Sequence, residues 1–315
     1  MNGGSGGGRQ SLAEAQFYPN DYDGIWASCP AINWTQFLAS GLWAVTVMNE
    51  YDHILGFHKI NAFRDAVHNS VGGKENYFQV EERIDFDPYT ILGQKTKGGK
   101  ITEKDCLVMQ EIWKGPHTTG NDFLWYSFLP GGTFWNKIIP IGSFYYPLIG
   151  KRPKCFSLVE QYVHLAFEDP KKDLLHLKIR DFEKVFDTCI RKLGWLSCDH
   201  ADLRPFANAG GKLIIDHGLD DPLIPVEGTI DYYHHMREIH GGQNFIDRFC
   251  RLYINPGDGH GNCHTNGPGM TESTGIQALM NWVEHNKAPE NLPAVLVNQK
   301  TGKTIRKGIV KPWRV

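Results

Sequence analysis

The sequence predicts an α/β fold that is interrupted by a long, mostly helical insertion. Three observations support this prediction. A glycine turn, a helical pattern and an apolar strand follow one another at the start of the chain. Strands and helices alternate again in the last third, whereas the stretch between shows helical patterns without β-α-β alternation. We therefore assign residues 1–34 and 207–315 to an α/β core and residues 35–206 to an inserted lid.

The first element is the turn GGSGGG at residues 3–8, which has two interpretations. Glycine-serine runs at a terminus are typical of flexible linkers. The same residues satisfy G-x-S-x-G, a strained strand-to-helix turn that exposes a catalytic serine. Leu12, Ala15 and Phe17 follow at helical spacing, and a short buried strand is predicted from Ile25 to Ser28. A linker would not lead directly into a helix in the correct phase, so the second interpretation is favoured.

The middle of the chain contains three helical patterns: TQFLASGLWAVTVMNEY, TEKDCLVMQEIWKG and IRDFEKVFDTCIRKLG. Polar, glycine-bearing loops separate them, such as GQKTKGGK and GPHTTGND. This organisation favours a helical cap over a continuation of the sheet.

The α/β pattern resumes with a predicted strand from Lys212 to Asp216, followed by a loop and a helix. FCRLYIN predicts the next strand, and a Pro-Gly loop follows it. TESTGIQALMNWVEHNKAP predicts a closing helix that Thr271 or Ser273 caps. Its apolar face is expected to hold four residues: Ile276, Leu279, Met280 and Val283.

Composition excludes several classes of function. The net charge of -2 argues against binding to nucleic acid, which usually requires a basic surplus. No stretch approaches the roughly 20 apolar residues of a membrane-spanning helix. The seven cysteines are an odd number and form no C-x-x-C pair, so a metal site has little support. One loop, GHGNCHTNG, groups His260, Cys263 and His264 and leaves a loop ligand set as an alternative.

Three loops that follow predicted strands each carry one group suited to nucleophilic catalysis. They are Ser5, Asp220 or Asp221, and His260, in the chain order expected of the α/β-hydrolase architecture. Serine becomes a useful nucleophile when a histidine accepts its proton, and a carboxylate then holds that histidine in the correct tautomer. The backbone N–H of Gly6 is the predicted oxyanion donor. His217, also after a strand, is interpreted as a structural histidine.

These residues lie in segments that resemble the tannase/feruloyl esterase family of α/β-hydrolases. GGSGGGRQSLAEAQFYPNDYDGIWASCPAINWTQ is similar to the nucleophile region of that family. GGKLIIDHGLDDPLIPVEGTIDYY resembles its acid loop, and YINPGDGHGNCHTNGPG resembles its histidine loop. ITEKDCLVMQEIWKGP and LWYSFLPGG look like parts of its lid. The resemblance implies Ser5 as nucleophile, Asp221 as acid and His260 as base, with Asp220 as second choice.

The resemblance also implies a substrate class. We expect a serine hydrolase that cleaves esters of aromatic hydroxy acids, of the feruloyl or galloyl type, through an acyl-enzyme. Acyl transfer or peptide cleavage by the same triad stays open. Five lid aromatics are candidates to stack on the aromatic ring of this small-molecule substrate: Trp113, Trp125, Tyr126, Phe134 and Trp135.

The sequence departs from the family pattern at two places. Gly4 and Gly261 stand where the family has the cysteines of a disulfide that ties the serine and histidine loops together. The stretch that corresponds to the calcium loop of the family keeps Asp85 and Asp87 but has few other carboxylates. Since Ca²⁺ takes six to eight oxygen ligands, we expect no calcium and no other cofactor.

The chain begins four residues before Ser5 and resembles the carboxyl-terminal part of a longer family member. The second oxyanion donor normally lies in the preceding part, so activity is expected to need that segment or self-association. The alternative function is a truncated or degenerate, non-catalytic fragment that acts only as a binding or assembly partner. Secretion is the family expectation, and no signal peptide is visible in the sequence.

Overall fold

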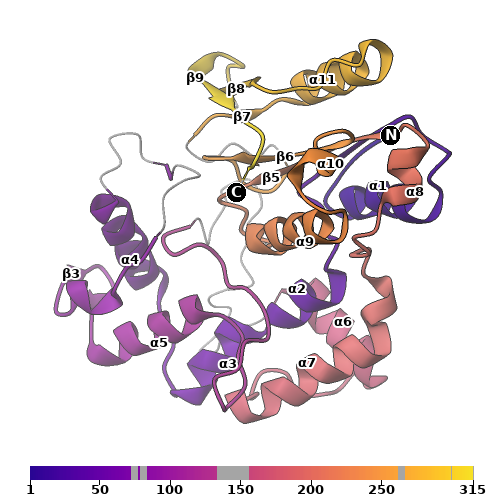
Figure 1. Ribbon diagram of the computed structural model, residues 1–315. Helices are drawn as coiled ribbons and strands as arrows, with labels where there is room; N and C mark the ends of the chain where they lie inside the picture. Colours follow the sequence, from indigo (N-terminus) through magenta and orange to yellow (C-terminus); the bar gives the residue numbers. More distant parts are fainter. Residues whose placement is uncertain (72–76, 79–83, 133–155, 262–266, 299, 315) are drawn as a thin grey trace. The chain divides into compact units, whose positions relative to one another are not determined.

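The computed structural model describes residues 1–71, 77–78, 84–132, 156–261, 267–298 and 300–314 (Figure 1). Its packing forms two compact units. Unit 1 comprises Met1–Asn33, Glu75–Glu82 and Ser197–Val315, and unit 2 comprises Trp34–Lys74 and Arg83–Leu196. Among the described residues, no helix has the length and apolarity that crossing a membrane requires.

Unit 1 is built on a four-stranded sheet in which all neighbouring strands are parallel. Its order is β1 (Asn2–Gly4), β2 (Gly24–Ser28), β5 (Lys212–Gly218) and β6 (Cys250–Asn255). Ser28 is in register with Gly4 on one side and with Asp216 on the other. The strand ends therefore share one edge, where catalytic groups gather in α/β sheets.

Helices cover both faces of this sheet because alternate strand residues point to opposite faces. Ile25 and Ala27 pack with helices α1 (Gly6–Phe17) and α9 (Val226–Ile239), whereas Trp26 packs with α11 (Glu272–His285). Unit 1 also contains α8 (Arg204–Asn208), α10 (Gln243–Ile246) and the antiparallel strands β7 (Gly269–Met270), β8 (Leu292–Val297) and β9 (Thr304–Val310).

The predicted apolar face of the closing helix is wrong. Thr271 caps α11 as expected, accepting a hydrogen bond from Thr274 N at 3.2 Å. Three of the four predicted residues are exposed, however: Ile276, Met280 and Val283. The helix is turned because Gly275 lets the Trp26 ring approach, and a Cβ at Gly275 would lie 2.7 Å from that ring.

Unit 2 is mainly helical. Its helices are α2 (Trp34–Ser40), α3 (Trp43–Glu50), α4 (Phe57–Ser70), α5 (Glu103–Lys114), α6 (Ser157–Phe167) and α7 (Ile179–Leu193). Two short 3₁₀ helices (Pro88–Ile91 and Gly194–Leu196) and a hairpin of β3 (Lys95–Thr96) and β4 (Gly99–Lys100) complete the described part.

A buried ion pair fixes the start of α5. Thr102 and Asp105 form a reciprocal capping box, and the fully buried Asp105 carboxylate also binds Lys59 at 2.6 Å and His53 at 2.8 Å. Unit 2 stops at Leu196. The later residues Leu203 and Phe206 pack in the core of unit 1 although the sequence assigns them to the insertion, whose role as a lid stays a prediction.

Candidate active site

Ser5 occupies a strained turn between β1 and α1. Its φ of 59° and ψ of -120° lie where side chains rarely occur, and its N–H donates to Ser28 O at 3.0 Å. A Cβ at Gly3 would lie 2.4 Å from Gly7 O, and one at Gly8 would lie 2.7 Å from Ser28 O. Gly3 and Gly8 are therefore required by close backbone packing. The opening segment forms a strand-turn-helix and not a flexible linker.

Asp221 follows β5 and is buried. Its Oδ1 accepts hydrogen bonds from Leu223 N at 2.7 Å and Ile224 N at 3.0 Å. Its Oδ2 lies 2.8 Å from His260 Nδ1 and 3.1 Å from His217 Nε2. Burial opposes ionisation, but the two histidines outweigh it and hold the pKa of Asp221 well below its ordinary value.

His217 is the fully buried support of this carboxylate. Its Nδ1 lies 2.8 Å from Thr229 Oγ1, and its Nε2 faces Asp221 Oδ2 and Ile224 O. The structural role that the sequence predicted fits this position. The sequence did not show that His217 shares Oδ2 with His260.

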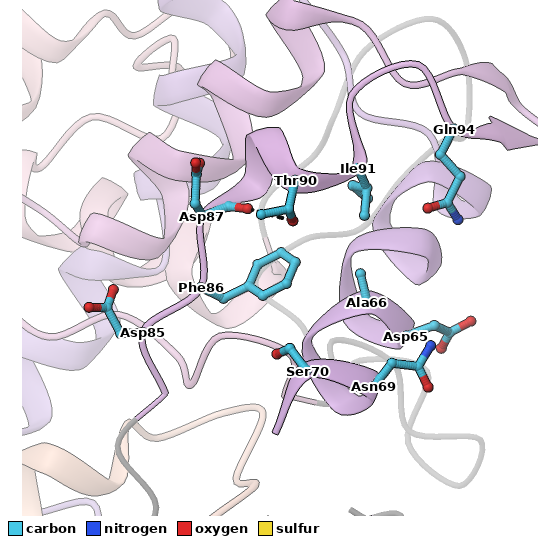
Figure 2. A pocket seen from close by; sticks show the side chains of 10 residues that line it. All are labelled: Asp65, Ala66, Asn69, Ser70, Asp85, Phe86, Asp87, Thr90, Ile91 and Gln94. Atoms are coloured by element: carbon cyan, nitrogen blue, oxygen red, sulfur yellow. Dashed lines mark hydrogen bonds between the residues drawn. The ribbon is translucent and has the colours of Figure 1, made fainter. Parts of the chain in front are cut away.

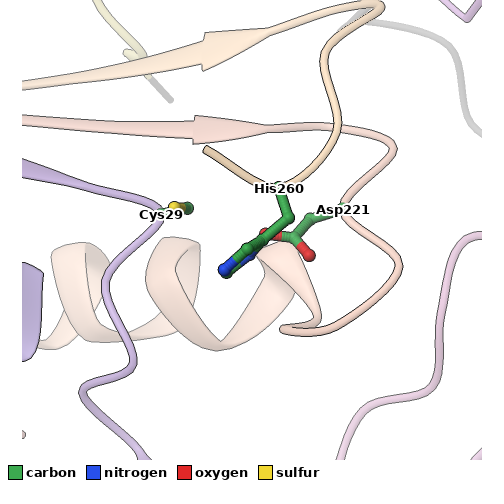
Figure 3. A group of neighbouring side chains, drawn as sticks. All are labelled: Cys29, Asp221 and His260. Atoms are coloured by element: carbon green, nitrogen blue, oxygen red, sulfur yellow. The ribbon is translucent and has the colours of Figure 1, made fainter. Parts of the chain in front are cut away.

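His260 lies in the loop after β6, and its ring points at Asp221 (Figure 3). Burial disfavours a charge on this imidazole. The Asp221 carboxylate and, to a smaller extent, Cys29 outweigh this effect and raise the pKa of His260 above its ordinary value. Asp221 is thus the carboxylate paired with His260, whereas the backbone N–H of Asp220 donates to Asp258 O at 3.0 Å.

Cys29 is the residue that sequence reasoning missed. It directly follows β2, has a φ of 36° and is buried, and its N–H donates to Asp216 O at 2.6 Å. One potential ligand atom each of Cys29, Asp221 and His260 lies within 4.8 Å of the others. A Cβ at Gly261 would lie 3.9 Å from Cys29 Sγ. The sequence did place Cys29 directly after a predicted strand, and this position could have marked it as a candidate site residue.

Ser5, Asp221 and His260 all follow strands of one parallel sheet, at the edge where those strands end. Gly6 opens α1, so its N–H is one of the helix-start donors that have no acceptor within the helix. Within the described ranges, no hydrogen bond joins the Ser5 hydroxyl to His260. The described residues thus include a preformed pair of Asp221 and His260 and a strained serine that is not hydrogen-bonded to it.

Some of the residues on which the cysteine and metal predictions depend lie outside the described residues. Cys29, Cys106, Cys189, Cys198 and Cys250 are free thiols. Cys155 lies outside the described residues, as do Cys263 and His264 of the alternative loop ligand set. The absence of the family disulfide therefore stays a prediction.

Three of the five predicted lid aromatics lie in the described part of unit 2. The half-buried Trp113 ring meets Phe63 and Phe86 edge-on, each at 6.1 Å, and the buried Trp125 ring meets Tyr126 at 5.1 Å. The indole N–H groups of Trp113 and Trp125 are buried, and no described residue accepts a hydrogen bond from them. Phe134 and Trp135 lie outside the described residues.

A cavity of about 650 Å³ in unit 2 is lined in part by Asp85 and Asp87, which belong to the stretch that corresponds to the calcium loop of the family (Figure 2). Asp65, Asp85 and Asp87 line it. Asp87 already accepts a hydrogen bond from Tyr89 N at 2.9 Å as the cap of a 3₁₀ helix. Few carboxylates are thus available among the lining residues, and the segment 79–83 lies outside the described residues. The absence of calcium stays a prediction.

Comparison with known proteins decides the family. The model of the family described as tannase and feruloyl esterase matches residues 1–122 and 151–313. The chain belongs to this family. A probable feruloyl esterase of Arthroderma benhamiae is 30% identical over 310 residues, which cover 92% of this chain and 55% of that protein.

Two solved structures show that tannase and feruloyl esterase family members share this fold. The crystal structure of feruloyl esterase B from Aspergillus oryzae has a TM-score of 0.83 at 19% identity, over 99% of this chain and 64% of that one. The tannin acyl hydrolase of Aspergillus niger has a TM-score of 0.78 at 22% identity, over 98% and 60%. The predicted α/β-hydrolase fold is confirmed. The chain spans a little more than half the length of the curated relatives it matches.

Proposed function

We propose that this chain carries the catalytic centre of a serine carboxylic-ester hydrolase that cleaves esters of aromatic hydroxy acids. The observation that supports this most is the strained Ser5 turn on the same sheet edge as the Asp221–His260 pair. The substrate class follows from the relatives, whose names include feruloyl esterase and tannin acyl hydrolase.

The reaction would begin with attack of Ser5 Oγ on the ester carbonyl while His260 accepts the hydroxyl proton. Collapse of the tetrahedral intermediate releases the alcohol, which takes that proton from His260, and leaves the acyl group on Ser5. Water, deprotonated by His260, then attacks the acyl-enzyme, and collapse of the second tetrahedral intermediate releases the acid while Ser5 Oγ takes the proton back from His260. Asp221 stabilises the imidazolium in both steps through the 2.8 Å contact with Nδ1.

The surroundings of Asp221 are suited to this task. Two backbone N–H groups and His217 fix the carboxylate, so it can hold the His260 ring without moving itself. Gly6 N–H would donate to the oxyanion from the start of α1.

The substrate ring would be held by the lid. Tryptophan rings suit stacking on a phenolic ring, and the buried N–H groups of Trp113 and Trp125 have no acceptor among the described residues. This role for the two tryptophans, and for Tyr126, Phe134 and Trp135, is part of the proposal.

Fluorophosphonate labelling of the purified chain tests the proposal. We expect an adduct that mass spectrometry maps to Ser5, that is absent in Ser5→Ala and strongly reduced in His260→Ala. Ser11→Ala is a matched control because Ser11 is a fully buried serine on the same helix. A folded wild-type chain that is not labelled, or is labelled equally in Ser5→Ala, would refute a catalytic Ser5.

The second candidate is a non-catalytic fragment that acts as a binding or assembly partner. The observation that favours it is that no hydrogen bond joins the Ser5 hydroxyl to His260 among the described residues. The non-catalytic candidate predicts that the chain folds but is not labelled by the fluorophosphonate. Labelling of Ser5 without turnover of methyl ferulate or methyl gallate would instead favour a catalytic chain that needs a further segment for substrate binding.

A further inference from the structure

The Cys29 thiol has no part in the proposed ester chemistry, yet it lies beside the two groups that drive it (Figure 3). Cys29 and Asp221 are only 1% and 5% exposed, and the His260 side chain is 11% exposed. A sulfur, an imidazole nitrogen and a carboxylate oxygen thus lie within 4.8 Å of one another with a narrow opening to solvent at His260.

We propose that Cys29, Asp221 and His260 form a Zn²⁺ site, and that zinc bound there inhibits the hydrolase. Zinc sites that keep an open position have three protein ligands, drawn from cysteine, histidine and carboxylate side chains. A mixed sulfur, nitrogen and oxygen set selects Zn²⁺ over Ca²⁺ and Mg²⁺, which prefer oxygen ligands. The inhibitory part of this proposal rests on the proposed function, and the binding part does not.

The distances are close to those of a zinc site. Zinc bonds of about 2.0–2.3 Å in a tetrahedron place ligand atoms about 3.3–3.8 Å apart. From a spread of at most 4.8 Å, the sulfur needs to approach by up to about 1 Å, whereas Asp221 Oδ2 and His260 Nδ1, which are 2.8 Å apart, need to separate by about 0.5 Å. Gly261, whose φ of 63° suits glycine, directly follows His260.

The charge balance also favours a divalent cation. Binding converts the Cys29 thiol to a thiolate and sends that proton to solvent, while the proton on Nδ1 of the neutral His260 moves to Nε2, so affinity rises with pH. A thiolate and the Asp221 carboxylate then neutralise Zn²⁺. The metal takes the place of the proton between Asp221 Oδ2 and His260 Nδ1, while His217 stays as the outer partner that orients the carboxylate.

Inhibition follows from the loss of the base. With Nδ1 bound to the metal, the neutral imidazole carries its proton on Nε2 and has no free lone pair to accept the Ser5 proton. The carboxylate that would stabilise the imidazolium is also engaged by the metal. Zinc therefore prevents the attack of Ser5 on the ester carbonyl without binding to Ser5 itself.

Metal titration of the chelator-treated chain tests the site. We expect one Zn²⁺ per chain by equilibrium dialysis, displaced by a chromogenic chelator, and no binding of Mg²⁺ or Ca²⁺ at the same site. With Co²⁺ as probe, the wild type should show a thiolate-to-cobalt charge-transfer band. Cys29→Ser should abolish that band and weaken Zn²⁺ binding by more than about tenfold, since even outer-shell partners are worth about 10–100-fold.

Cys198→Ser is the matched control, because Cys198 is another buried free cysteine of unit 1. It should keep the wild-type Zn²⁺ affinity and cobalt band. A wild type without a thiolate–cobalt band overturns the proposal whether or not any variant folds. Equal Zn²⁺ affinity in wild type and Cys29→Ser also overturns it. Both readouts work on a chain without esterase activity, so failure of the proposed function is seen separately in the labelling experiment.

Discussion

Replacing Gly8 by alanine tests whether the opening glycines form a packed turn. Gly8 lies on the inner side of α1, and a Cβ there would lie 2.7 Å from Ser28 O and 2.9 Å from Pro30 Cα. Both are backbone atoms, so the chain after β2 must move. Overpacking of this kind costs about 1–3 kcal/mol. The gain in helix propensity, about 1 kcal/mol at most, offsets part of it.

Gly7→Ala is the matched control, since a Cβ at Gly7 would meet nothing within 4 Å. It carries the same gain in helix propensity without a clash, and it should stabilise unit 1 by up to about 1 kcal/mol. For a domain of this size, 1 kcal/mol corresponds to about 2–4 °C in Tm. The two variants should therefore shift the Tm of unit 1 in opposite directions.

Thermal unfolding followed by circular dichroism and tryptophan fluorescence measures both shifts. We expect a lower Tm for Gly8→Ala and an unchanged or higher Tm for Gly7→Ala. If both variants unfold at the wild-type temperature, residues 3–8 are not packed against β2, and the argument for a strained Ser5 turn fails.

Three further predictions follow from the described contacts. Asp221→Asn should lower kcat by about 10⁴, because the amide favours the wrong tautomer of His260; an ester assay showing less than a tenfold loss would contradict this. Asp105→Asn should cost unit 2 about 3–5 kcal/mol, since it leaves Lys59 buried without its partner, and chemical denaturation at neutral pH measures that loss. Burial opposes ionisation of Asp105, but its bonds to Lys59 and other donors hold its pKa below the ordinary value of 3.8. Its stabilisation is therefore present above pH 3.8 and lost as pH falls through the folded pKa, a dependence that should flatten in Asp105→Asn. Thr271→Ala should destabilise unit 1 by about 1 kcal/mol through loss of the α11 cap, whereas a Tm equal to the wild type would show that this cap contributes nothing.

The sheet and the order of the catalytic candidates could be predicted because local patterns specify them. The strand from Ile25 to Ser28 and the helix before it were visible in the apolar spacing, and strand ends pointed to Ser5 and His260. The choice of Asp221 over Asp220 came from the family resemblance. Local sequence does not show which of two adjacent carboxylates turns toward the histidine.

Other features depend on contacts between distant segments, which a single sequence does not show. Cys29 comes close to Asp221 only because β2 and β5 are neighbouring strands, and the Oδ2 atom that the nearby His217 contacts is shared with the distant His260. The exposed side of α11 was mistaken for its buried side because Gly275, not an apolar side chain, decides how the helix meets Trp26. The catalytic roles themselves stay predictions until labelling tests them.

The discontinuity of unit 1 has a consequence for biosynthesis. β2 pairs with β5, and Ile32 O accepts a hydrogen bond from Cys198 N at 2.8 Å, so both ends of the insertion are held together. Closing a flexible loop of that length costs about 4–5 kcal/mol of chain entropy. A unit 2 that folds first would remove most of that cost. Variants that weaken unit 2, such as Asp105→Asn, should therefore slow the pairing of β2 with β5, although unit 2 contributes none of the four strands of that sheet.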